Sequence, residues 1–151
     1  MKTPTNLEKG KEYEQFINTY INILPTTQNS YLWQDVPEQV LYNAGLITDY
    51  NEHRLKRKNK NVDPDAEENE NTLKDVGIDI IQVKNEDEIV FVQCKNYKNA
   101  IRVEDLAGFW MIMMKHIGKN GAVYHSVNRI SINIKENMCD RVQFIHKPFF
   151  R

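Results

Sequence analysis

Two runs rich in isoleucine and valine, joined by a polar segment, restrict the possible folds of this chain more than any other feature. The runs span residues 76–83 and 88–95, and Asn85, Glu86 and Asp87 lie between them. Residues branched at Cβ favour strands, and a polar connection between two such runs is typical of a tight turn. The sequence therefore predicts a β-hairpin in this region.

Polar side chains interrupt this apolar hairpin at defined positions. Because side chains alternate between the two faces of a strand, the second run directs one set of residues to each face. The first set is Ile89, Phe91, Gln93 and Lys95, and the second is Val90, Val92 and Cys94. Asp79 lies on the partner strand, flanked by Ile78 and Ile80, which face opposite to it. Hairpin pairing can therefore bring the Asp79 carboxylate beside Gln93. Cys94 is expected to be a small buried hydrophobic residue and not a nucleophile.

The Asp79 and Lys95 side chains need compensating partners, because an unpaired charge among apolar strands costs several kcal/mol. A magnesium ion provides this compensation, since it prefers oxygen ligands, takes one or two carboxylates, keeps several waters and accepts a phosphate oxygen. We therefore expect Asp79, Gln93 and the backbone carbonyl of Cys94 to bind Mg²⁺, with Mn²⁺ as a substitute. Lys95 is expected to orient or help deprotonate the attacking water and to stabilise charge that develops on phosphorus.

The same residues resemble a known superfamily of nucleases. The strings DVGIDII at 75–81 and VQCKNY at 92–97 are similar to the motif of the PD-(D/E)XK restriction-endonuclease-like superfamily, closest to its Mrr-like branch. The resemblance implies a nuclease fold with Asp79, Gln93 and Lys95 in the active site. Many members of the superfamily carry Glu or Asp where this chain has Gln93, which removes one charge from the expected metal site. Glutamine is usual in the Mrr-like branch.

The resemblance also implies a fourth site residue. Mrr-like nucleases carry a glutamate on the first helix after a tyrosine or phenylalanine, and the string YEQF at 13–16 looks like this element. Glu14 would then supply the negative charge that Gln93 lacks. On a helical wheel Glu14 falls at the edge of the apolar stripe that contains Ile17 and Ile21, so its side chain can face inward.

The remaining elements predict an α/β domain with a central mixed sheet flanked by helices, and the resemblance implies that this sheet is restriction-endonuclease-like. Helices are expected from Thr5 to Pro25, from Asp35 to Gly45 and from Glu104 to Ile117, and further strands at 122–125, 129–134 and 142–146. These elements follow from apolar spacing and from residues that begin or end helices. We expect the first and the last of these helices on opposite faces of the sheet.

A charged segment at residues 52–75 precedes the hairpin. Its first half is cationic, around Arg54 and Arg57, and its second half is acidic, around Asp65 and Glu67. The opposed signs favour a solvated insertion, and contact of the cationic half with the DNA backbone is the alternative. We expect a single nuclease-like domain over residues 1–151 that contains this insertion.

The composition excludes several other classes of protein. The formal net charge of −1 gives no overall attraction to nucleic acid, so DNA must bind through a local basic surface. No stretch approaches the roughly 20 apolar residues of a membrane span, and the first residues are too polar for a signal peptide. We therefore expect an intracellular protein, in the cytoplasm or in a viral or nuclear context. The four histidines have no metal-ligand spacing and are expected to be structural or exposed.

Together these features predict magnesium-dependent hydrolysis of phosphodiester bonds in DNA. Segments 32–38 and 106–109 are similar to nuclease domains that precede superfamily II helicases of large DNA viruses, which implies a helicase module in the same polypeptide. Cutting of both strands by a protein with one active site favours a homodimer. The alternative is a DNA-binding or protein-docking module that keeps this scaffold without turnover, because Gln93 removes an acidic ligand.

Overall fold

The computed structural model describes residues 6–47, 77–97, 101–127, 130, 134 and 140–149. The chain divides into two compact units, one formed by Met1–Trp33 with Val76–Arg151 and the other by Gln34–Asp75. The described part of the second unit contains α2 (Glu38–Asn43), which is shorter than the helix predicted between Asp35 and Gly45. The charged segment at 52–75 lies outside the described residues.

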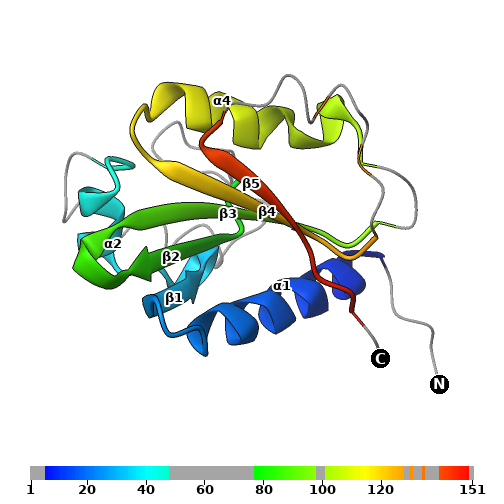
Figure 1. The fold of residues 1–151 in the computed structure, drawn as a ribbon, viewed down its shortest axis with the longest axis horizontal. Helices are drawn as coiled ribbons and strands as arrows, with labels where there is room; N and C mark the ends of the chain where they lie inside the picture. Colours follow the sequence, from blue (N-terminus) through cyan, green and yellow to red (C-terminus); the bar gives the residue numbers. More distant parts are fainter. Residues whose placement is uncertain are drawn as a thin grey trace, which may run out of the picture. The chain divides into compact units, whose positions relative to one another are not determined.

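The first unit is built on a mixed sheet, as predicted (Figure 1). Its strands lie in sequence order: β1 (Thr27–Leu32), β2 (Ile80–Lys84), β3 (Ile89–Lys95), β4 (Asn120–His125) and β5 (Val142–His146). The β1–β2 and β2–β3 pairs are antiparallel, whereas the β3–β4 and β4–β5 pairs are parallel. The last residues of β3, β4 and β5 and the first residue of β2 therefore meet at one end of the sheet, which we call the carboxyl end.

Helices cover both faces of this sheet, in agreement with the sequence analysis. In Figure 1, α1 (Asn6–Asn22) lies on one face and α4 (Ala107–Lys115) on the other. The α1 face has a buried core formed by Tyr13, Ile17, Ile21, Ile80, Val90, Val92, Cys94, Ala122 and Tyr124. On the α4 face, Phe91 contacts His116, with ring centroids 5.7 Å apart. Among the described residues, no helix is long and apolar enough to cross a membrane.

The predicted hairpin is confirmed, with a later start. Ile80 pairs with Val92 and Val83 with Ile89, so β2 and β3 are adjacent and antiparallel. The polar connection forms a 3-10 turn, η2 (Asn85–Asp87), in which Glu86 and Asp87 have positive φ angles of 65° and 60°. The first predicted run began at residue 76, whereas β2 begins at Ile80 and residue 76 lies outside the described residues.

Strand β1 was not predicted, because its sequence TQNSYL is mostly polar. Polar contacts with α1 hold it in place. The Asn22 side chain accepts a hydrogen bond from the backbone nitrogen of Ser30 and donates one to the Ser30 carbonyl. The Ser30 hydroxyl donates to Asn18 Oδ1 at 2.6 Å. These contacts form only in the tertiary structure, so no local pattern of apolar residues predicts the strand.

Two other predicted elements differ from the structure. The helix expected from Glu104 to Ile117 begins as a 3-10 turn, η3 (Val103–Leu106), and continues as α4 only to Lys115. The strand expected at 129–134 is wrong at Ile134, which is helical, while Ile130 forms an isolated parallel bridge with Ile101. Residues 129 and 131–133 lie outside the described residues. The strand predicted at 142–146 is confirmed as β5.

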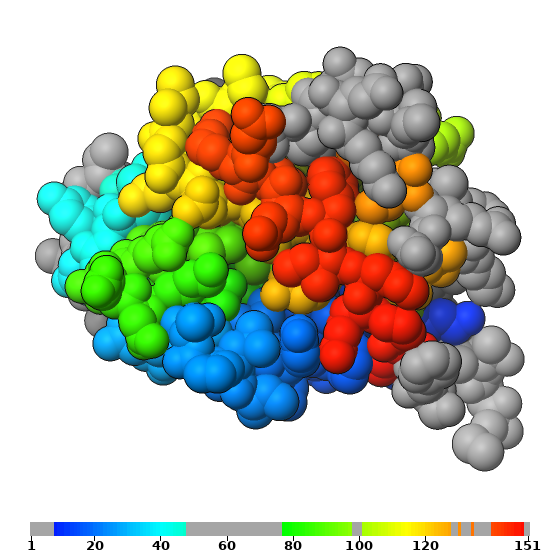
Figure 2. Space-filling view, viewed as in Figure 1, coloured from blue at the N-terminus to red at the C-terminus, as the bar shows by residue number. Residues whose placement is uncertain are grey.

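The segment after β5 anchors α1 to the sheet. The Tyr13 hydroxyl donates a hydrogen bond to the Lys147 carbonyl at 2.9 Å. Phe149 stacks on Phe16 with ring centroids 5.1 Å apart, and Figure 2 shows this C-terminal segment, in red, against α1, in blue. Burial raises the pKa of Tyr13 far above its usual range, so its hydroxyl stays protonated as the donor. The hydrogen bond of Tyr13 therefore holds α1 in place directly before Glu14.

Gly77 allows the start of α4 to approach the chain just before Asp79. Its φ angle is 89°, a conformation that residues with a side chain rarely adopt. A Cβ atom at this position would lie 2.7 Å from the backbone nitrogen of Phe109 and 2.9 Å from the carbonyl carbon of Gly108. Both contacts are with backbone, which cannot move aside as a flexible side chain can. The glycine of the 75–81 string is thus required by packing.

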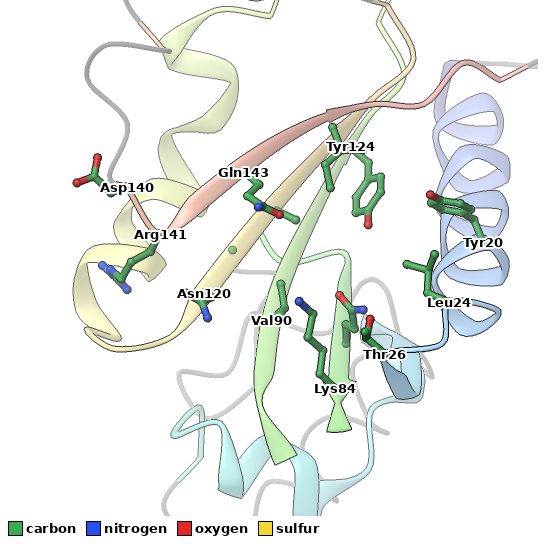
Figure 3. Close-up of a pocket in the computed structure, with 14 residues that line it drawn as sticks. Tyr20, Leu24, Thr26, Lys84, Val90, Asn120, Tyr124, Asp140, Arg141 and Gln143 are labelled. Atoms are coloured by element: carbon green, nitrogen blue, oxygen red, sulfur yellow. The ribbon is translucent and has the colours of Figure 1, made fainter. Parts of the chain in front are cut away.

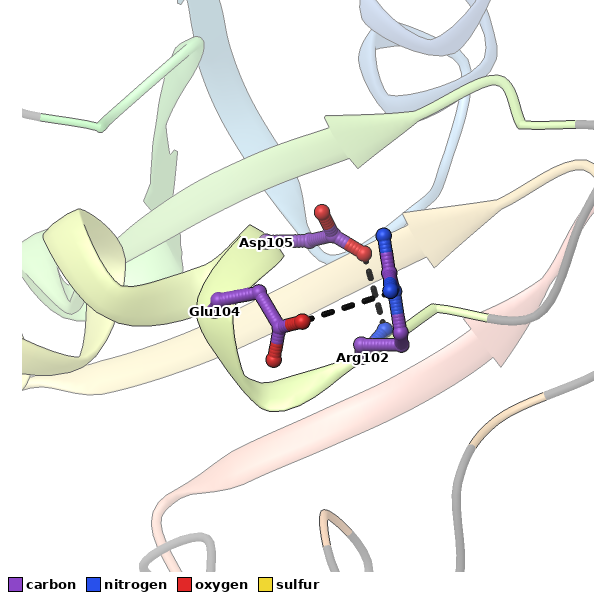
Figure 4. A network of polar contacts seen from close by, with 3 residues as sticks. All are labelled: Arg102, Glu104 and Asp105. Atoms are coloured by element: carbon purple, nitrogen blue, oxygen red, sulfur yellow. Dashed lines mark hydrogen bonds and ion pairs between the residues drawn. The ribbon is translucent and has the colours of Figure 1, made fainter.

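Arg141 satisfies carbonyl groups at the C-terminal end of α4. Its guanidinium donates hydrogen bonds to the carbonyls of Met113, His116 and Lys119 at 2.8, 3.1 and 2.7 Å. The last carbonyls of a helix lack partners within the helix, and a cation there also interacts favourably with the helix dipole. By contrast, the Arg102 side chain forms an exposed ion pair with Glu104 at 3.5 Å, and the Arg102 backbone nitrogen donates to Asp105 (Figure 4).

We expect Gly77→Ala to lower the free energy of unfolding by at least about 2 kcal/mol, because it adds backbone strain and a steric clash. Gly118→Ala is a matched control, since Gly118 also has a positive φ angle, 97°, but open space around its Cβ position. Chemical denaturation followed by circular dichroism measures both variants. Equal losses of stability in the two variants would show that the contact with Phe109 has no energetic effect.

Replacement of Arg141 by methionine keeps an aliphatic stem but removes every donor. Because three carbonyls then lose a charged partner, we expect Arg141→Met to lower the free energy of unfolding by about 2–3 kcal/mol. Arg102→Met serves as the control, and its loss should stay below about 1 kcal/mol because exposed ion pairs contribute little. Urea denaturation of both variants compares the two arginines. An Arg141 effect no larger than that of Arg102 contradicts the assigned role.

Candidate metal and catalytic site

Asp79 occupies the carboxyl end of the sheet between β1 and β3. Its backbone nitrogen donates to the Val92 carbonyl at 2.8 Å, and its carbonyl accepts a hydrogen bond from the Trp33 nitrogen at 2.9 Å. The residue therefore continues the pairing of β2 on both sides, although the strand itself begins at Ile80. Backbone hydrogen bonds of this kind fix the direction of the side chain.

The structure brings the side chains of Asp79 and Gln93 together. Gln93 Nε2 donates a hydrogen bond to Asp79 Oδ2 at 2.6 Å. The backbone nitrogen of Cys94 donates to the same oxygen at 2.8 Å. Gln93 is only 7% exposed, whereas Asp79 is half-buried, so the contact between them is partly buried. The carboxylate and the amide predicted to share a site are in direct contact.

Lys95 lies on the same face and at the same end of the sheet. Side chains alternate along β3, and Val92 and Cys94 belong to the core on the α1 face, so Gln93 and Lys95 point to the α4 face. The half-buried Lys95 directs its Nζ atom toward the Tyr97 hydroxyl at 3.4 Å, and it lies 5.3 Å from the centroid of the Tyr97 ring.

Glu14 approaches this end of β3 from the other layer. It lies on α1, directly after the buried Tyr13, and is half-buried. Burial raises the pKa of the Cys94 thiol, the carboxylates of Asp79 and Glu14 raise it further, and Lys95 lowers it. Three charged residues therefore lie close enough to affect one thiol. Because the thiolate is the reactive form of cysteine, the raised pKa agrees with an inert, buried Cys94.

Two histidines also lie at the carboxyl end of the sheet, and the sequence analysis did not place them near Lys95. Lys95 on β3 pairs with His125 on β4, and His125 pairs with His146 on β5. His125 is 2% exposed, whereas His146 is exposed. The sequence places each histidine at the last position of a predicted strand, but the pairing of these strands with β3 is not visible in any local pattern.

A separate pocket lies away from the Asp79–Gln93 contact. Its volume is about 390 Å³, and its lining includes Tyr20, Lys84, Asn120, Tyr124 and Arg141 (Figure 3). Lys84 ends β2, Asn120 begins β4 and Arg141 precedes β5, so these residues belong to the end of the sheet opposite Asp79. None of the predicted site residues lines this pocket. The candidate site therefore lies at the carboxyl end of the sheet, outside this cavity.

The donor atoms at the candidate site fit a hard cation. Asp79 and Glu14 offer carboxylate oxygens, Gln93 an amide oxygen and Cys94 a backbone carbonyl, and Mg²⁺ prefers oxygen ligands of these types. Within the described residues, no group of three or more His, Cys, Asp or Glu side chains is placed to hold a metal ion. The amide now directs Nε2 to Asp79, so a cation bound by both side chains requires a rotation that brings the Gln93 oxygen forward.

Comparisons with known proteins identify the family. A family model described as a restriction endonuclease, of the Mrr catalytic type, matches residues 51–148, which include Asp79, Gln93 and Lys95 but not Glu14. The structure of the ATP-dependent Type ISP restriction-modification enzyme LlaBIII bound to DNA has a similar fold, with a TM-score of 0.61 and 14% sequence identity. The match covers 93% of this chain and 8% of that chain. No curated protein sequence is significantly similar. Since the family model spans more than half of the sequence, this chain belongs to the Mrr-type restriction endonuclease family.

Proposed function

We propose that this chain is a metal-dependent nuclease that hydrolyses phosphodiester bonds in DNA. The observation that carries the proposal is the direct contact between Asp79 and Gln93 at the carboxyl end of the sheet, within the segment that matches the restriction endonuclease family. Asp79, Gln93, the Cys94 carbonyl and Glu14 would hold Mg²⁺, with Mn²⁺ as a substitute. The bound ion would polarise the scissile phosphate and neutralise its charge.

Protein side chains would orient the metal ligands and the attacking water in this reaction. Asp79 is held by two hydrogen bonds on one oxygen, so its carboxylate is oriented before substrate binds. Lys95 would orient or help deprotonate the attacking water and stabilise negative charge on the phosphate in the transition state. The Tyr97 hydroxyl lies 3.4 Å from the Lys95 ammonium. Preorganised groups of this kind contribute to rate because they need no rearrangement during the reaction.

We further propose that residues 1–151 act as one nuclease domain within a larger assembly. The similar restriction-modification enzyme is described as ATP-dependent, and this chain corresponds to 8% of its length. A helicase module in the same polypeptide would supply movement along DNA. Two copies of the nuclease domain would place one active site on each strand of a duplex.

The rival function is a DNA-binding or protein-docking module without turnover. Gln93 favours it, since this residue replaces a second carboxylate beside Asp79 and thereby reduces the attraction for a cation. Titration calorimetry with Mn²⁺ separates the two functions. If the protein is a nuclease, the wild type should bind Mn²⁺ and Asp79→Ala should not. If it is a module without turnover, the two proteins should give the same heat.

Lys95→Ala is expected to reduce cleavage of plasmid DNA in Mg²⁺ by about 10²–10⁴-fold, because a positioned catalytic group contributes a factor of this order. Asp79→Asn should reduce cleavage at least as much. Lys115→Ala provides the control, since this exposed lysine lies at the C-terminal end of α4. Gel assays of the purified proteins measure the rates. Full activity of Lys95→Ala would falsify the assignment.

The role of Glu14 is tested by metal affinity. If Glu14 contributes a charge to the site, Glu14→Gln should weaken Mn²⁺ binding by about 10-fold, which corresponds to about 1.4 kcal/mol. Glu12→Gln removes the same charge from an exposed position on the same helix and should change the affinity less than about twofold. Calorimetry or the electron paramagnetic resonance signal of Mn²⁺ reports both. Equal effects of the two substitutions would exclude a direct role for Glu14.

A further inference from the structure

Two histidines continue the row of side chains that begins at Lys95. Lys95 pairs with His125, and His125 pairs with His146, so the three residues occupy neighbouring strands at the same level of the sheet. Adjacent strands are about 4.8 Å apart. Gln143 and Ile145 line the pocket on the α1 side of β5, so alternation directs His146 to the α4 face, the face of Gln93 and Lys95. The row therefore lies beside the Asp79–Gln93 contact.

Backbone carbonyls in one short segment orient both imidazole rings. His125 Nδ1 lies 2.9 Å from the Val127 carbonyl, and His146 Nε2 lies 3.2 Å from the Ser126 carbonyl. Because a carbonyl can only accept, the engaged nitrogen of each ring carries the proton. The two rings are nearly parallel, with an angle of 19° between their planes and centroids 5.6 Å apart. The buried His125 ring thus supports the exposed ring of His146.

Lys95 and His146 form the two ends of the row, and neither of these basic residues forms an ion pair in the described part of the chain. His146 uses its Nε2 atom for the hydrogen bond to the Ser126 carbonyl, and its Nδ1 atom takes no part in that bond. An imidazolium donates through both nitrogens, and a nearby anion favours this charged form. A phosphate group is a suitable anion, because contacts with DNA phosphates position a protein on the duplex irrespective of sequence.

We propose that His146, supported by His125, binds a DNA phosphate adjacent to the phosphate that is cleaved. The inference rests on the proposed nuclease function, because it assumes that the DNA strand passes the Asp79–Gln93 contact. His146 donates Nδ1–H to a phosphate oxygen, and Lys95 faces the neighbouring phosphate at the reaction centre. His125 is a positioning residue that holds the His146 ring at the required angle.

Fluorescence anisotropy with a labelled DNA duplex tests this contact. Full-length protein is titrated in EDTA, which prevents metal-dependent cleavage, at several salt concentrations. We expect His146→Ala to raise Kd by about 3–10-fold and to reduce the slope of log K against log salt concentration by about one, as for loss of one phosphate contact. His146→Lys should restore both values, because it returns a cation to the same position. Gln143→Ala, on the same strand but the opposite face, should change neither.

Each alternative outcome overturns the inference. If His146→Ala binds as tightly as wild type with the same salt slope, the phosphate contact does not exist. If the variant binds weakly, keeps the wild-type salt slope and is not rescued by His146→Lys, the histidine has a structural role only. In both cases, cleavage that Asp79→Ala abolishes would leave the proposed function intact. Failure of the wild-type protein to bind DNA, together with no cleavage, would refute both.

Discussion

The backbone hydrogen bonds on both sides of Asp79 hold the candidate site in register. They connect Asp79 to Trp33 at 2.9 Å and to Val92 at 2.8 Å, so the residue is paired with chain segments before and after it. A slip of one residue in β2 would turn the carboxylate to the α1 face, where the core contains only apolar and aromatic residues and Cys94. The contact with Gln93 therefore depends on the register of the hairpin. That register is maintained by Ile80 and Val92, which are fully buried.

Much of this arrangement could be predicted, because the decisive information is local. Alternation within residues 88–95 places Gln93 and Lys95 on one face, and the pairing of two apolar runs places Asp79 opposite Gln93. The apolar spacing of α1 and α4 indicates that each helix covers one face of a sheet. Glu14 is different, since its spacing shows only that it can face inward. Its assignment came from resemblance, and the family match does not include it.

The parts that could not be predicted depend on contacts between distant segments. Strand β1 is polar and is held by Asn18 and Asn22 of α1, so its sequence lacks the alternation that marks a strand. The row from Lys95 to His146 depends on parallel pairing across three strands that are far apart in the sequence. From the sequence, Arg141 would be taken for a surface cation, yet its guanidinium donates hydrogen bonds to three carbonyls around the end of α4. In each case a polar side chain has a partner that no nearby residue indicates.

Gln93 gives the site a different physical character from one with two carboxylates. A glutamate at 2.6 Å from Asp79 Oδ2 would place two negative charges together, and one would be protonated unless a cation were present. The Gln93 amide instead donates a hydrogen bond to Asp79, so the two side chains attract and do not repel each other. Binding a cation between the two side chains then requires loss of this hydrogen bond, which contributes about 1.5–3 kcal/mol when one partner is charged. A substrate phosphate would add both an oxygen ligand and a negative charge, so a cation at this site would bind more tightly with DNA than to the protein alone.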